Sequence, residues 1–265
     1  LLVGPVCGML VSSVPAGDGG SDATALLSAA PAMGLGMSIL AIAIAGVLAI
    51  VVARLVGASD AMFCAGVALA WAATGSGRLT GIIRATGVDD PFTRLAVEGL
   101  LLGVLTALTC WLVLRICPFP DDGRDREIIN THSGIAIGVG SVAGLAAGWL
   151  LAQAGSFGQA FAAAIGAGVA SGIAARVAAF QAPLSALAMS IPVVATLGPL
   201  IGRALSGQDL VAEIYAGQIS SLARIMPFDW VAGMLIGLPI GASWAKMLVE
   251  HQPTSERKTA SRSSI

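Results

Sequence analysis

Long apolar stretches alternate with short polar connections along most of this chain. Each of seven stretches comes close to the roughly 20 residues that an α-helix needs to cross a hydrocarbon core of about 30 Å. The predicted spans are residues 36–56, 61–77, 92–117, 133–152, 161–180, 183–205 and 228–249. The pattern therefore predicts an all-α fold, a polytopic transmembrane helical bundle of about seven spans within residues 34–249.

The two ends of the chain differ from this bundle. Residues 1–33 combine an apolar stub, too short to cross a membrane, with a linker rich in Gly, Ser and Asp. The stub fits either the remnant of a signal peptide or part of a helix, and the linker over residues 17–28 is expected to be solvated. Residues 250–265 form a polar C-terminal tail that is expected to be disordered.

Polar connections set the expected orientation. With the N-terminus outside, nine Lys and Arg residues fall on the inner side and five on the outer side. Because positive charge gathers on the cytoplasmic side, we expect a multi-pass protein of the cell membrane with its N-terminus outside and its C-terminus in the cytoplasm. Two semi-polar segments, 78–90 and 206–226, are expected on the outer side as amphipathic helices at the interface or as structured loops.

Composition strengthens the membrane interpretation. Charged residues make up 11% of the chain, against about 25% in a soluble domain, so the lipid bilayer is the expected partner. A net charge of −1 provides no basic surface for nucleic acid. The four cysteines and two histidines lack metal-ligand spacing, and no catalytic motif is present. We therefore predict no cofactor, no metal and no enzymatic activity.

Two parts of the chain echo each other. Arg54 and Thr74 are 20 residues apart, as are Arg176 and Thr196, and each of the two Arg residues follows an Ala. Each copy continues to a Gly-Arg pair and then to a Pro-Phe pair, at 77–78 and 91–92 in the first and at 202–203 and 227–228 in the second. The echo predicts a 3+1+3 parallel internal repeat, in which the fourth span is an unpaired connector. The alternative is chance matching in a chain rich in Ala and Gly.

The sixth span contains the main candidate site. Pro192 removes a backbone donor from a membrane helix, and Ser190 and Thr196 lie beside it. Broken helices of this kind often line transport sites, although a simple kink is the alternative. Glu98 is the other candidate, because an acid within a span is a proton or cation site by default. Its alternative is an ion pair with Arg94, one helical turn earlier.

Glycines recur every four residues in several predicted spans. The rows are Gly140, Gly144 and Gly148; Gly233, Gly237 and Gly241; Gly99 and Gly103; and Gly168 and Gly172. Small residues at this spacing form a flat helix face on which another helix can pack closely. The rows predict tight packing, and they also offer a surface for a homo-oligomer or for a partner in a membrane complex.

These observations favour two functions. The first is a small-solute transporter or permease, with a substrate site at Ser190, Pro192 and Thr196 in the sixth span and at Glu98 in the third. The second is a non-catalytic subunit or scaffold of a membrane protein complex, because the spans contain few polar groups and many glycines.

Overall fold

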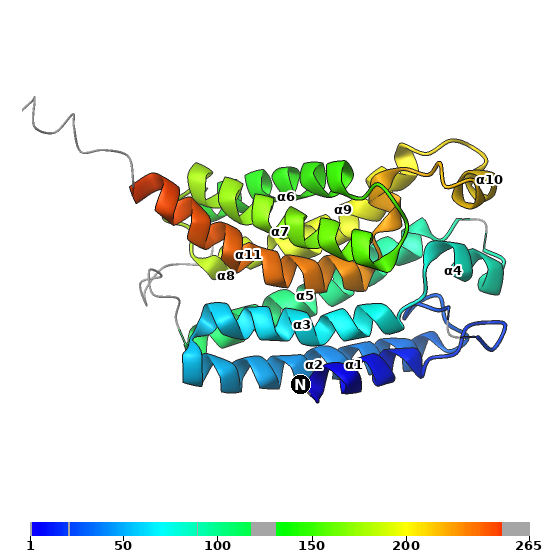
Figure 1. The fold of residues 1–265 in the computed structure, drawn as a ribbon, viewed down its shortest axis with the longest axis horizontal. Coiled ribbons are helices and arrows are strands. Elements are labelled where there is room, and N and C mark those ends of the chain that lie inside the picture. The colour runs from blue at the N-terminus through cyan, green and yellow to red at the C-terminus, as the bar shows by residue number, and fades with distance from the viewer. Residues whose placement is uncertain (1, 21, 89, 118–130, 251–265) are drawn as a thin grey trace, which may run out of the picture.

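A computed structural model gives the fold of residues 2–20, 22–88, 90–117 and 131–250. Within these ranges all regular secondary structure is helical and there is no strand (Figure 1). The helices are α1 (Val3–Ser12), α2 (Pro31–Val56), α3 (Ala58–Gly75), α4 (Leu79–Thr86), α5 (Phe92–Ile116), α6 (Thr131–Leu151), α7 (Phe157–Ala178), α8 (Leu184–Ala188), α9 (Ser190–Ala204), α10 (Leu210–Tyr215), the 3₁₀ helix η1 (Ser221–Arg224) and α11 (Pro227–Glu250). Most of the predicted polar tail and of the charged loop after the third span lies outside the described residues.

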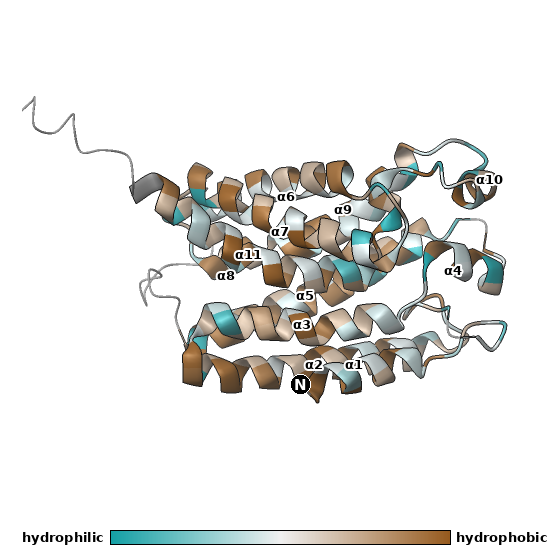
Figure 2. Ribbon diagram, in the orientation of Figure 1, coloured by the Kyte–Doolittle hydropathy of each residue, from teal (hydrophilic) through white to brown (hydrophobic). Residues whose placement is uncertain are grey.

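Among the described residues, six helical segments are long and apolar enough to cross a membrane, namely α2, α5, α6, α7, α11 and the segment Leu184–Ala204 that α8 and α9 form together. Their apolar residues run along the full length of the bundle, and hydrophilic residues gather towards its ends (Figure 2). The prediction of a polytopic helical bundle is confirmed. Seven spans were predicted. The second of them, α3, is not among these six, because Asp60 lies in the first turn of this 18-residue helix and makes it less apolar than the others.

The helices pack as two halves, α1–α5 and α6–α11. Within the halves, α1 contacts α2 and α3, and α6 contacts α7 and α9. Between the halves the contacts are reciprocal: α3 packs against α11, and α9 packs against α5. Each helix of the first half runs in the same direction as its counterpart in the second half (Figure 1). The counterparts are α1 and α6, α2 and α7, α3 and α9, and α5 and α11. By this packing the fourth predicted span, α6, corresponds to α1. The predicted 3+1+3 repeat had left the fourth span without a counterpart.

Glycines allow the closest of these contacts. A Cβ atom added at Gly233 of α11 would lie 2.5 Å from the Cβ of Ala164 on α7, and one added at Gly103 of α5 would lie 2.5 Å from the Cα of Pro192 on α9. Real Cβ atoms do not approach other atoms so closely, so a larger side chain would push the helices apart. These rows face helices of the same chain. An association with a second copy would therefore have to use another surface.

The segment between α1 and α2 folds back onto the bundle. Residues 17–20 are exposed, but most of residues 23–27 are buried, and the Gly77 N–H donates to the Ala23 carbonyl at 2.7 Å. The expectation of a solvated linker is wrong for residues 23–27. The apolar side chains of Ala23, Ala25 and Leu27 find cover there, and the backbone gains partners in the α3–α4 connection.

The two semi-polar segments cover one end of the bundle. Helix α4 contacts α10, and their apolar side chains form a small cluster of their own with the start of α5. The buried members of this cluster include Ile82, Ile214 and Ile219. The segments are therefore structured against each other, and they form the walls of the cleft described below.

Candidate functional site

The sixth span is broken beside Pro192. Helix α8 ends at Ala188 and α9 begins at Ser190, with Met189 between them. Pro192 has no N–H to donate to the carbonyl of Ala188 four residues earlier, so the α-helical pattern cannot continue unchanged through this turn. The interruption lies against α5, where Gly103 provides the space for Pro192.

Hydroxyl groups bond to the backbone around this break. Ser190 Oγ donates to the carbonyl of Leu187 at 2.7 Å and lies 3.1 Å from Ser171 Oγ on α7. Thr196 Oγ1 donates to the carbonyl of Pro192 at 2.6 Å. Both bonds run to a carbonyl three or four residues earlier in the same segment. In this conformation the hydroxyl groups of Ser190 and Thr196 are therefore already engaged.

A groove of about 450 Å³ lies beside Pro192 and Thr196. Its lining is apolar apart from Thr196, whose hydroxyl group bonds within its own helix. The lining residues are Leu100, Val104, Ile137, Met189, Pro192, Val193, Thr196 and Leu197. The groove suits an apolar occupant better than a polar solute.

Glu98 lies under the segment that connects α1 to α2. Its side chain is fully buried, and its Oε2 accepts a hydrogen bond from the Leu26 N–H at 2.8 Å. Arg94 is exposed, and no ion pair joins it to Glu98 in the part of the chain that the structure describes. The alternative of an Arg94 pair is therefore wrong. No hydrogen bond connects Glu98 to Ser190, Pro192 or Thr196 among the described residues, so the structure does not unite the four candidates in one polar site.

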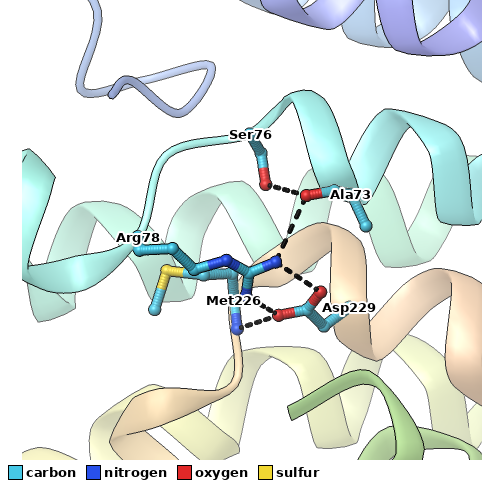
Figure 3. A network of polar contacts seen from close by, with 5 residues as sticks. All are labelled: Ala73, Ser76, Arg78, Met226 and Asp229. Carbon is cyan, nitrogen blue, oxygen red and sulfur yellow. Dashed lines mark hydrogen bonds and ion pairs between the residues drawn. The ribbon is translucent and has the colours of Figure 1, made fainter. Parts of the chain in front are cut away.

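A buried ion pair joins the two halves at the end that carries α4 and α10 (Figure 3). Arg78, just before α4, donates through Nη1 and Nη2 to Asp229 in the first turn of α11, at 2.5 and 3.2 Å. The Asp229 carboxylate is fully buried and also accepts from the Met226 N–H at 3.1 Å. Arg78 Nη2 donates to the Ala73 carbonyl at 3.3 Å, and its guanidinium carbon lies 4.9 Å from the centre of the Phe157 ring.

A second ion pair joins the halves in the reverse sense. Arg203, in the last turn of α9, donates through Nε to Asp90, just before α5, at 2.8 Å. Arg78 and Arg203 are the two arginines of the Gly-Arg echo, and each bonds to an aspartate at the start of the last long helix of the other half. Both arginines are among the five basic residues that the charge count places on the outer side, and the sequence pattern alone gave neither of them a partner. The signal that could have found them was an aspartate near each Pro-Phe pair.

A cleft of about 460 Å³ opens beside Arg78. It lies between α4, the α6–α7 connection and the α10–η1 region. Its lining residues are Arg78, Leu79, Thr80, Gln153, Ala154, Gly155, Ile214, Gly217, Ile219 and Arg224. Arg224 donates to the carbonyls of Ile219, Gly217 and Gln153, and thereby ties the two connections together. The volume is in the range of sites for small molecules.

The bundle, its lipid-facing surface and its polar end define a polytopic integral membrane protein. Large apolar side chains remain exposed on its long helices, among them Val51, Val142, Leu150 and Leu248, as expected where helices face hydrocarbon. Comparison with known protein families, with curated proteins and with solved structures found no match.

Proposed function

We propose that the protein is a small-solute transporter whose two halves move against each other. The observation that carries the proposal is the reciprocal packing of α3 on α11 and of α9 on α5, with an Arg–Asp pair across each boundary. Parallel repeats related by an axis along the membrane normal are a known transporter architecture, and their substrate sites lie at the interface of the repeats.

The boundary between α5 and α9 is the proposed path. It contains the break at Pro192, which packs on Gly103 of α5. Ser190 lies two residues before Pro192, and its hydroxyl group bonds within the second half, to the Leu187 carbonyl, beside Ser171 of α7. A separation of α9 from α5 that loosens this break would make Ser190 accessible, and Thr196 and Glu98 lie on the same two helices. A substrate-binding role for Ser190, Pro192, Thr196 and Glu98 belongs to this open state.

The test does not require a known substrate. Ser190 is almost fully buried, so the single cysteine variant Ser190→Cys, in a background without the native cysteines, should be protected in a rigid bundle. A protein whose halves alternate should expose this thiol to a water-soluble maleimide within minutes. Ala136→Cys on α6 is the matched control, because Ala136 is fully buried outside the boundary. Equal protection of both thiols in proteoliposomes would contradict the transport proposal.

A pair of cysteines tests whether the movement requires separation of the halves. The double variant Asp90→Cys, Arg203→Cys places two thiols where an exposed ion pair now joins the halves. A short, cleavable bifunctional thiol reagent should fix the boundary and, when it is installed first, prevent labelling of Ser190→Cys. Labelling that is unchanged by the cross-link would show that the reaction reflects local opening.

The alternative function is a non-catalytic subunit or scaffold of a membrane complex. The apolar groove beside Thr196 and the Gly-mediated packing of α7 on α11 favour this function, because neither offers a polar route. Purification in mild detergent distinguishes the two functions. A stoichiometric partner that stays bound through size-exclusion chromatography would support the scaffold, whereas an isolated monomer with a reactive Ser190→Cys would support the transporter.

A further inference from the structure

From the cleft beside Arg78 we infer a binding site for a small oxyanion, a solute that carries a carboxylate or phosphate group. Two arginines line this cleft, together with the exposed hydroxyl-bearing residue Thr80. Arginine presents its N–H groups in a planar fork that matches carboxylate and phosphate oxygens.

The positive charge of the cleft is not balanced within it. Arg78 has Asp229 as its counter-ion. Arg224 bonds only to carbonyl oxygens, and no carboxylate pairs with it in the part of the chain that the structure describes. The two carboxylates near α10 bond to backbone N–H groups instead: Asp209 accepts from the Ala212 N–H and Glu213 accepts from the Gly207 N–H.

Donors also remain free at both arginines. A guanidinium group has five N–H donors. Asp229 and Ala73 engage three of those of Arg78, which leaves its Nε–H and one Nη1–H without a partner among the described residues. Contacts with carbonyls account for four of those of Arg224. An anion in the cleft would therefore gain charge-assisted hydrogen bonds without displacing the existing contacts.

The carbonyl contacts of Arg224 explain how a cation can be held at this position. They fix the guanidinium between the α6–α7 connection and the α10–η1 region before any ligand arrives. A preorganised cation loses little side-chain entropy when it binds an anion. Binding in the cleft does not depend on transport. The further role of the cleft as the outer entry point for an anionic substrate rests on the proposed function.

The test is a titration of the purified, detergent-solubilised protein with inorganic phosphate and, separately, with succinate, by isothermal calorimetry at constant ionic strength. Saturable binding of either anion is expected. Thr80→Glu should weaken it by about tenfold or more, because a like charge enters the cleft beside the arginines. Arg224→Gln should have a comparable effect, and size-exclusion chromatography shows whether this variant is folded. Arg94→Gln removes an exposed arginine outside the cleft and should leave the affinity unchanged.

The arms of the experiment separate the outcomes. Binding of succinate alone identifies a carboxylate site, binding of phosphate alone identifies a phosphate site, and binding of both identifies a general oxyanion site. No saturable binding of either anion to the wild-type protein overturns the inference, as does binding that Thr80→Glu leaves unchanged. If the anions bind but the Ser190→Cys thiol stays protected, the anion site stands and the transport proposal fails.

Discussion

The substitution Asp229→Ala tests whether the buried ion pair holds the two halves together. It removes an acceptor of three hydrogen bonds, two from Arg78 and one from the Met226 N–H. Arg78 would keep its contact with the Ala73 carbonyl and its position over the Phe157 ring. Its charge would have no counter-ion.

The cost follows from the burial of the two partners. Removing one partner of a buried ion pair costs about 3–5 kcal/mol, because the other charge stays unpaired. Asp229 is 0% exposed but the side chain of Arg78 is 22% exposed, so water can reach part of the remaining guanidinium. We therefore expect the lower end of this range, about 3 kcal/mol, which corresponds to a change of roughly 150-fold in the unfolding equilibrium.

The assay is reversible unfolding in mixed micelles, followed by tryptophan fluorescence or circular dichroism. A double-mutant cycle with Arg78→Ala isolates the pairwise coupling energy from the other effects of each substitution. The exposed pair provides the matched control. Arg203 and Asp90 have side chains that are 37% and 45% exposed, so their cycle should give only about 0.2–1 kcal/mol. A cost below about 1 kcal/mol for Asp229→Ala, or equal couplings in the two cycles, would refute the reasoning.

Three further predictions concern other parts of the fold. Gly237→Val should destabilise the bundle by about 1–3 kcal/mol, because its Cβ would meet the backbone of α7. Gly138→Val should change the stability little, because Gly138 has open space around it. Equal unfolding midpoints of the two variants would contradict this contrast. Glu98→Leu should make residues 17–28 more sensitive to proteinase K, because Leu26 loses its acceptor, whereas Glu98→Gln keeps an acceptor oxygen and should protect the segment. A cysteine at Gln218 should react with an impermeant maleimide on intact cells if the N-terminus is outside; reaction only after permeabilisation would reverse the orientation.

The helical bundle could be predicted because membrane helices carry their signal locally. A run of about 20 apolar residues predicts a span whatever it packs against, and the observed helices begin and end close to the predicted limits. Helix α3 fell short of the others because Asp60 lowers the mean hydropathy of an already short run. The burial of residues 23–27 escaped prediction, since their cover comes from the distant α3–α4 connection.

The Arg78–Asp229 pair could not be predicted from local pattern. Its partners are 151 residues apart in the chain, and only the packing of α3 on α11 brings them together. The candidate hydroxyl groups of the sixth span show the opposite case. Ser190 and Thr196 bond to carbonyls three and four residues earlier in their own segment. Such local bonds are expected for a simple kinked helix, which was the alternative interpretation of this span. Their role in an open state stays a prediction.

The two ion pairs occupy equivalent places in the halves but differ in cost, and this difference gives the proposed movement a direction. Loss of the exposed Arg203–Asp90 pair costs at most about 1 kcal/mol, whereas a movement that parts Arg78 from Asp229 while one charge stays buried leaves that charge unpaired and costs about 3 kcal/mol. The boundary between α9 and α5 should therefore open first, while the boundary between α3 and α11 stays closed. A cysteine at Ser190, beside the first boundary, should accordingly react faster than one at Ala232, where Gly66 packs against α11. The reverse order would mean that solvation of the ion pairs does not decide which boundary opens.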